Sequence, residues 1–164
     1  MTSAALVLAL VTLQRLGELW LAQRNTRRLL ARGAYEIGAG HYPLIVALHA
    51  AWLGSLWLLA WIAPVDLSWL GVYVALQALR GWVLATLGSR WTTRIIVLPD
   101  APLVRTGPYR FISHPNYVVV AAEIAVLPLV FGLVWHAVLF TGLNAAVLAI
   151  RISTESTALE QHRV

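Results

Sequence analysis

Long runs of apolar residues, interrupted only by short turns or arginine-rich segments, constrain this chain more than any other feature. The runs cover about residues 4–22, 42–62, 67–87, 115–133 and 135–150. A helix needs about 20 apolar residues to cross a hydrocarbon core of ~30 Å, so the last run is short unless it tilts little, thins the bilayer or begins earlier. Because the alternating segments of about ten residues that form membrane barrels are missing, we predict an all-α, polytopic integral membrane protein with about five transmembrane helices.

Composition narrows the classes of protein further. With 60% hydrophobic and 12% charged residues, a water-soluble domain of this size would lack the polar surface to cover itself. The chain has no cysteine, which excludes disulfides, thiolate metal sites and a cysteine nucleophile. The N-terminus lacks the basic segment and cleavage site of a secretory signal, so we interpret it as a retained first helix.

The positions of the arginines predict an orientation. They concentrate in residues 24–32, in residues 88–114 and in the tail from Arg151, whereas the turns around residues 64–66 and 131–133 have none. Basic loops favour the cytoplasmic side, so we expect these three segments in the cytoplasm, the N-terminus outside, and the protein in a bacterial inner membrane. This distribution also accounts for the high isoelectric point of the chain, so we do not predict nucleic acid as a partner.

We therefore expect one domain in four parts. They are three N-terminal spans (1–87), a cytoplasmic loop (88–114), a helical hairpin (115–150) and a cytoplasmic tail (151–164). The sequence does not indicate an oligomeric state.

Ionisable residues inside the apolar runs should face the protein interior, because charge in hydrocarbon is costly. Arg15 and Glu18 are three residues apart and can meet on one helix face. Arg80 and Glu123 lie in different runs; a structural ion pair is favoured over a place on an acceptor path. His41 and His49 lack acidic or thiol partners at ligand spacing, so we predict no metal.

The strongest motif lies where the loop enters the fourth run, at residues 105–117, RTGPYRFISHPNY. Gly107 and Pro108 favour a turn, and Pro115 suits the first turn of a helix, whose free backbone donors can hold an anion. Tyr109 and His114 add ring faces and hydrogen-bonding groups, which suits a nucleotide-like ligand bearing a carboxylate. The residues alone equally allow an interfacial loop whose Tyr and Arg side chains bind headgroups.

A second candidate cluster lies at the end of the last run. Arg151 and Glu155, spaced i, i+4, share a helix face that Asn144 extends inward. This spacing allows either a surface ion pair or part of a binding site.

Together these features resemble the isoprenylcysteine carboxyl methyltransferase family. Its signature, G-x-Y-x-x-x-x-H-P-x-Y followed by a helical hairpin and R-x-x-x-E, matches this chain at every fixed position, over about Trp82 to Leu159. The family often has two adjacent acids after the arginine, whereas here Glu155 precedes Ser156, which puts the second acidic contact in doubt. Phospholipid N-methyltransferases and sterol reductases of the same superfamily share the terminal hairpin.

The resemblance implies a methyltransferase that uses S-adenosylmethionine and acts on a lipophilic, membrane-resident acceptor. It implies cofactor contacts from Ala101, Pro102, Leu103, Val104, Tyr109, His114, Pro115, Asn116, Tyr117 and Glu155. Catalytic roles are expected for Arg151, Glu155 and His114. A carboxylate acceptor would need no general base and could be held by Arg151, whereas a phenol or enol could use His114 or Glu155 as a base.

The acceptor itself stays open at this point. A prenylated cysteine, a long-chain alkylpyrone or alkylresorcinol, and a lipid amine are all candidates, and the brevity of the chain favours the alkylpyrone or phenolic lipid. Trp52, Trp57 and Trp82 lie deep in their runs, where they could shape an acceptor tunnel but more simply pack between helices. The alternative functions are a phospholipid N-methyltransferase and a non-enzymatic assembly factor or small transporter that uses Arg80, Glu123 and the basic loops.

Overall fold

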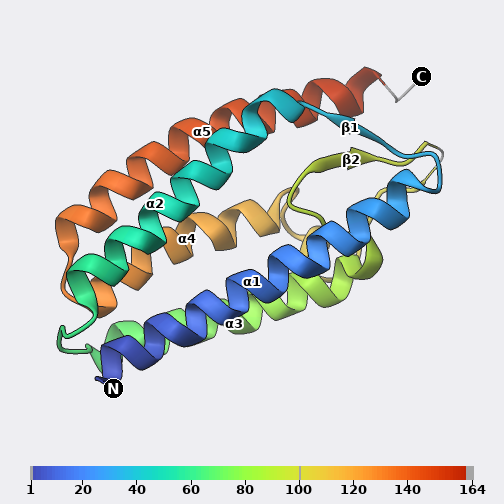
Figure 1. Cartoon of the computed structure of the whole chain (residues 1–164). Coiled ribbons are helices and arrows are strands. Elements are labelled where there is room, and N and C mark those ends of the chain that lie inside the picture. Colours follow the sequence, from blue (N-terminus) through green and yellow to red (C-terminus); the bar gives the residue numbers. More distant parts are fainter. Residues whose placement is uncertain (1, 100, 162–164) are drawn as a thin grey trace.

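The computed structural model describes residues 2–99 and 101–161, with side chains to residue 153. Its helices run lengthwise as a bundle (Figure 1). They are α1 (Ser3–Leu30), α2 (Tyr42–Ala60), α3 (Leu67–Leu87), α4 (Pro115–Val130) and α5 (Val134–Gln161). Four of them are long and apolar enough to cross a membrane, and α4 is a shorter apolar helix. The chain is an all-α, polytopic integral membrane protein, as the sequence predicts.

The hairpin differs in its boundaries from the sequence prediction. The short member is α4, with 16 residues, about 24 Å at 1.5 Å per residue, whereas α5 has 28 residues. Helix α4 ends early because Gly132 adopts φ 72°, and Leu133 N–H donates back to Pro128 O at 3.0 Å. Helix α5 continues to Gln161 because residues 151–161, expected as a tail, contain no glycine or proline.

The end of the bundle that carries the N-terminus also carries the two arginine-free turns, and we call it the turn end. Asp66 caps α3 by accepting from Ser68 N–H at 2.8 Å, as short polar residues before a helix commonly do. Its own N–H donates to Val130 O at 2.8 Å, which joins the α2–α3 turn to the end of α4. Thr2 Oγ1 donates to Trp61 O and ties the start of α1 to the same end.

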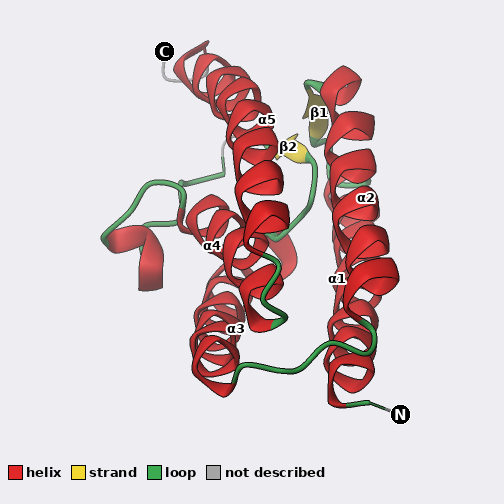
Figure 2. Ribbon diagram, turned by 90° about the vertical axis from the view of Figure 1, so that its left-hand side faces the viewer, coloured by secondary structure: helices red, strands yellow, loops and turns green. Residues whose placement is uncertain are grey.

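The opposite end holds the connections that contain arginine, and we call it the basic end. Strand β1 (Tyr35–Ile37) pairs antiparallel with β2 (Ile95–Val97), with Tyr35 opposite Val97 (Figure 2). Glu36 on β1 accepts from Arg94 Nη1 at 2.9 Å. Three short 3-10 turns complete this end at Ala39–His41, Gly88–Arg90 and Gly107–Arg110. The connections after α1 and α3 therefore share one end, as their arginines predict; which side of the membrane it faces stays a prediction.

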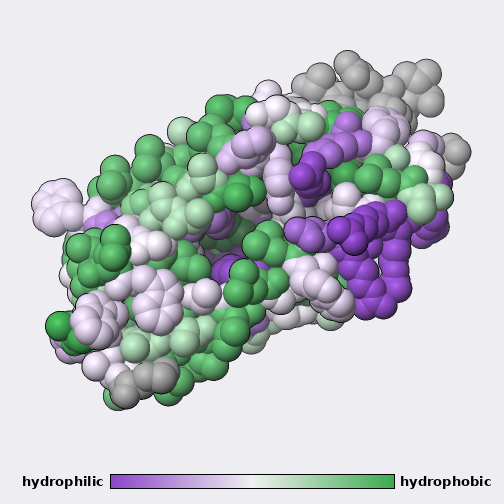
Figure 3. Space-filling model, in the orientation of Figure 1, coloured by the Kyte–Doolittle hydropathy of each residue, from purple (hydrophilic) through white to green (hydrophobic). Residues whose placement is uncertain are grey.

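Apolar side chains serve both the core and the outer surface of the bundle. Leu8, Trp52, Leu56 and Ile124 are buried between the helices. Leu58 is 81% exposed, and it is one of many large apolar side chains on the outside of the bundle, such as Leu59, Trp61 and Ile62. So extensive an apolar surface suits a bundle that lipid covers. Hydrophobic surface covers much of the bundle in Figure 3, and hydrophilic side chains gather at the basic end.

Candidate functional site

A cavity of about 270 Å³ lies inside the bundle. Helix α3 packs on α4, α4 on α5, and α2 on both α5 and α1. All five helices contribute to the wall, together with residues 91–93 that follow α3. Along α2 the wall contains Tyr42, Ile45, His49 and Trp52, a spacing that puts them on one helix face. On α5 it contains Asn144, Val147, Leu148 and Arg151.

At the basic end the cavity is bounded by hydrogen-bonded side chains that we call the polar layer. Arg151 donates from Nε to Tyr117 OH and from Nη1 to Thr93 O, both at 2.8 Å. Tyr42 OH lies 3.0 Å from Thr93 Oγ1. Trp91 Nε1 contacts Asn116 Oδ1 at 3.4 Å. The polar layer thus consists of Tyr42, Trp91, Thr93, Asn116, Tyr117 and Arg151, drawn from α2, α4, α5 and the segment after α3.

The segment after α3 is held in place by contacts with α1. Asn25 on α1 is buried and donates from Nδ2 to Trp91 O at 2.8 Å and to Gly88 O at 3.2 Å. Trp91, only 2% exposed, packs with Ala22 and Val83. These contacts draw residues 91–93 over the end of the cavity.

The motif loop is held against α3 by a close approach that only glycine permits. Gly107 adopts φ 56°, and a Cβ there would lie 2.4 Å from Thr86 Oγ1. A larger residue would combine left-handed strain with this clash. Tyr109, two residues later, packs against the Ala22, Val83 and Trp91 cluster.

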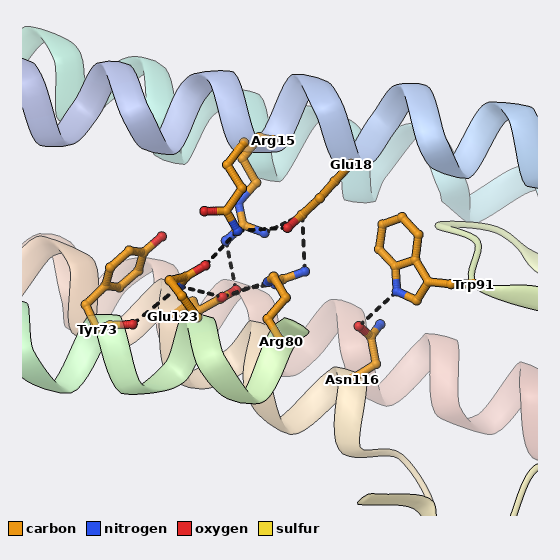
Figure 4. Close-up of polar contacts among 9 residues, drawn as sticks. Arg15, Glu18, Tyr73, Arg80, Trp91, Asn116 and Glu123 are labelled. Carbon is orange, nitrogen blue, oxygen red and sulfur yellow. Dashed lines mark hydrogen bonds and ion pairs between the residues drawn. The ribbon is translucent and has the colours of Figure 1, made fainter. Parts of the chain in front are cut away.

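Deeper in the membrane the cavity wall contains an ionic network that joins α1, α3 and α4 (Figure 4). Arg15 donates to Glu18 at 2.7 Å and to Glu123 at 2.8 Å. Arg80 donates from Nε to Glu123 Oε1 at 2.7 Å, also pairs with Glu123 Oε2, and lies 3.2 Å from Glu18. Gln77 adds a bond to Glu123 at 2.9 Å. Glu123 therefore accepts from α1 and α3 at once.

Burial makes this network a requirement of the fold. Glu123 is 1% exposed and Arg80 is 4% exposed, and an isolated charge at such a place would cost several kcal/mol. Two arginines face two glutamates, so the formal charges cancel. The expected pairs Arg15–Glu18 and Arg80–Glu123 are confirmed, and Arg80 and Glu123 also line the cavity.

The cavity is open between α1 and α2. Leu16 on α1 and Val46 on α2 line it while being 58% and 44% exposed, so the same side chains border both the cavity and the outer surface. The space-filling view shows a hollow between these helices, with apolar surface around it and hydrophilic surface inside (Figure 3). A ligand in the lipid can therefore reach the cavity sideways.

Only some of the residues expected at the site line this cavity. Asn116, Tyr117 and Arg151 do so. His114 stacks on Tyr117, with ring centroids 5.3 Å apart, and stands at the N-cap of α4 without a side-chain capping bond. The side chain of Glu155 lies outside the described residues. The structure thus brings Arg151 to the motif, through Tyr117.

The remaining expected cofactor contacts that the structure describes lie in the loop or at the start of α4, outside the cavity wall. Within residues 101–104, Pro102 O accepts from Arg90 Nη1 at 2.6 Å, and Leu103 is 55% exposed. Pro115 is buried at the start of α4. These positions stay proposals for the cofactor.

Several residues of the site are not evident from the sequence. Thr92 and Thr93 belong to no motif, and only the fold brings them to Arg151. His49 stands seven residues after Tyr42 on the same face of α2, and this helical spacing of the polar residues was a usable signal. Trp52, considered for an acceptor tunnel, does line the cavity.

Comparison with known proteins identifies the family of the chain. The family model of the isoprenylcysteine carboxyl methyltransferase (ICMT) family matches residues 69–161, more than half of the chain and all of α4 and α5. The chain is 37% identical to the uncharacterized protein YpbQ of Bacillus subtilis (strain 168), over 97% of this chain and 98% of the relative. It is 25% identical to an uncharacterized protein of Haemophilus influenzae, over 88% of each. No solved structure matches the chain. The chain belongs to the isoprenylcysteine carboxyl methyltransferase family.

Proposed function

We propose that this protein transfers a methyl group from S-adenosylmethionine to an oxygen of a lipophilic acceptor that enters from the membrane. Membership of the family implies S-adenosylmethionine-dependent methyl transfer at a membrane. The observation that carries the proposal is the position of the polar layer. It lies between the motif loop at the basic end and a largely apolar cavity that opens sideways. A polar cofactor and a greasy acceptor can meet there.

The polar layer, with His114 beside it, offers one group for a negatively charged acceptor oxygen and flat faces for the nucleoside of a cofactor. Arg151 is 7% exposed, and its guanidinium lies 5.2 Å from the centre of the Tyr117 ring. No carboxylate pairs with it among the side chains that the structure describes. A buried guanidinium that Tyr117 and Thr93 hold in position is suited to a carboxylate or an oxyanion. The stacked rings of His114 and Tyr117 provide flat faces for a base.

Bound S-adenosylmethionine supplies a methyl group on a sulfonium, which is already activated for displacement. The protein then has to orient the acceptor oxygen and keep water away. We assign the orientation to Arg151, whose two hydrogen bonds fix its plane. Asn116 and Tyr117, with residues 101–104, Tyr109, His114, Pro115 and Glu155, are proposed to hold the cofactor on the cytoplasmic side.

The lateral opening supports an acceptor with a long apolar chain. Its walls at Leu16, Val46, Leu53 and Val120 are apolar, so a hydrocarbon tail can lie across them and extend into the bilayer. Among isoprenylcysteine, alkylpyrone and alkylresorcinol acceptors, we propose the alkylpyrone or alkylresorcinol class.

The test uses purified protein in detergent. Calorimetry should detect binding of S-adenosylhomocysteine, and label from methyl-labelled S-adenosylmethionine should pass to an alkylpyrone or alkylresorcinol. Methylation of only a prenylcysteine would correct the acceptor. Folded protein that does not bind S-adenosylhomocysteine would overturn the proposal and favour the assembly-factor or transporter alternative.

A further inference from the structure

The motif loop carries two large apolar side chains on the outside of the protein. Phe111 is 73% exposed and Ile112 is 48% exposed, and we call these two residues the loop tip. Exposed apolar side chains are common on protein surfaces and prove little by themselves. The depth of the loop tip relative to the bilayer therefore decides whether it meets water or lipid.

This depth can be measured along α3. Helix α3 has 21 residues, about 31 Å at 1.5 Å per residue, which matches a hydrocarbon core of ~30 Å. A Cβ on Gly107 would meet Thr86 and, at 3.2 Å, Trp82 Nε1. Trp82 lies five residues before the end of α3 at Leu87, a distance of about 7.5 Å along the helix. The motif loop thus runs back along α3 and lies inside its span, beside a half-exposed tryptophan of the kind found at membrane interfaces.

The loop tip stays at this depth because the chain turns tightly there. Phe111 N–H and Ile112 N–H both donate to Pro108 O, at 3.1 and 3.2 Å. Tyr109 packs on the protein side of the loop, against the cluster that contains Val83. The loop tip therefore lies beside the last turns of α3 and faces outward, where hydrocarbon gives way to lipid headgroups.

Two arginines flank the loop tip. Arg105 and Arg110 are exposed, and neither forms an ion pair with a carboxylate among the described residues. The guanidinium of Arg110 lies 6.0 Å from the centre of the Phe111 ring, so a positive charge stands beside the exposed ring. Long basic side chains at a membrane boundary keep their stems in apolar surroundings and extend their charge toward lipid phosphates.

We propose that the loop tip inserts into the leaflet at the basic end, where Arg105 and Arg110 bind the phosphates of anionic phospholipids. Apolar insertion and charge act together in such contacts. Headgroup binding and a place at the cofactor site are compatible for this loop, because Tyr109 faces the protein while the loop tip faces lipid. Docking of the loop goes beyond the proposed function, since it requires neither cofactor nor acceptor.

The depth is tested in lipid nanodiscs with a fluorophore on single cysteines, which the cysteine-free chain allows. Phe111→Cys labelled with NBD should be quenched strongly by phospholipids that carry a nitroxide high on the acyl chain, and weakly by iodide in water. Because Phe111 is 73% exposed, the replacement spares the fold. Ile112→Cys provides a second position with the same expected result.

The matched control is Leu103→Cys, in the same loop. Leu103 is 55% exposed, but the neighbouring Pro102 O accepts from Arg90 Nη1, and Arg90 lies beyond the end of α3. NBD at this position should be quenched by iodide and hardly by the nitroxide lipids. The contrast between the two positions measures depth, because both side chains are apolar and exposed.

The charge is tested in nanodiscs that contain equal parts of phosphatidylcholine and phosphatidylglycerol, with the nitroxide on one lipid or the other. Labelled phosphatidylglycerol should quench NBD at Phe111→Cys roughly two- to fivefold more than labelled phosphatidylcholine, as arginines enrich anionic lipid. Arg105→Gln combined with Arg110→Gln should remove most of this preference. Arg27→Gln combined with Arg28→Gln removes the same charge from exposed positions in the last turn of α1 and should keep it.

The outcomes are distinct from those of the proposed function. Quenching of NBD at Phe111→Cys by iodide and not by nitroxide lipids would overturn the proposal and leave the loop tip free for a partner protein. Equal quenching by the two labelled lipids would overturn the assignment of anionic phospholipids. Lipid quenching whose preference is lost only in the Arg105 and Arg110 variant supports the proposal. Binding of S-adenosylhomocysteine to the same samples tests the proposed function separately.

Discussion

Replacement of Glu123 by glutamine should destabilise the protein more than any comparable loss of charge at its surface. Glu123 accepts hydrogen bonds from Arg15, Gln77 and Arg80 and is 1% exposed. Glutamine keeps the shape but offers one oxygen instead of two, turns an NH₂ group toward these donors, and leaves two arginines with one glutamate. Removing one partner of a buried ion pair costs about 3–5 kcal/mol.

The control is Glu36→Gln, at the basic end. Glu36 pairs with Arg94 at 2.9 Å, but the two side chains are 21% and 39% exposed, and such pairs contribute about 1 kcal/mol or less. The free energy of unfolding is measured for both variants by titration with a denaturing detergent, with loss of helix as the signal. Equal losses in the two variants would show that burial does not make the network essential.

A double variant refines the prediction. Arg80→Met combined with Glu123→Gln removes one charge of each sign and restores neutrality, with Arg15 still paired to Glu18 at 2.7 Å. The double variant should lose less stability than the sum of the two single losses, because residues in one network are coupled. Strict additivity would mean that the two side chains act independently.

Three further predictions follow from the site. Gly107→Ala should lower the free energy of unfolding by about 1–3 kcal/mol, because its Cβ would lie 2.4 Å from Thr86 Oγ1. The control, Gly81→Ala in helix α3, should be neutral or stabilising because a Cβ there has nothing within 4 Å. Equal effects of the two variants would contradict the close approach at Gly107. Arg151→Lys should slow methyl transfer about tenfold or more, since one ammonium cannot replace two directed donors; wild-type rates would remove Arg151 from the catalytic residues. In this cysteine-free chain, Leu103→Cys should react with an impermeant thiol reagent only from the cytoplasm and Leu67→Cys only from outside, and the opposite result would reverse the orientation.

Much of the fold could be predicted because lipid imposes simple rules on sequence. The apolar runs had to be helices, and the arginine-rich connections had to share one end of the bundle. Arg80 and Glu123 could be paired in advance because neither is stable alone in hydrocarbon. Glycines and prolines marked the loop. The short length of α4 could not be predicted, because the helix ends at Val130, inside a run that stays apolar beyond that residue.

The contacts that build the cavity could not be predicted in the same way. Membrane helices are apolar all round, so on α2 only the spacing of Tyr42 and His49 indicates which face turns inward. That spacing does not show which residues of the other helices this face meets. The link between Arg15 and Glu123 spans 108 residues and depends on how α1 lies against α4. Strands of three residues, such as β1 and β2, are too short for an alternating pattern.

The most direct test of the account is methyl transfer to a lipid in reconstituted vesicles. Label from S-adenosylmethionine is followed into the organic extract, with an alkylresorcinol in the bilayer or with chainless resorcinol supplied in water at the same total amount. Entry of the acceptor through the opening between α1 and α2, as proposed, predicts labelling of the alkylresorcinol and far slower labelling of resorcinol. Equal rates for the two acceptors, or no transfer to either by protein that binds S-adenosylhomocysteine, would contradict it.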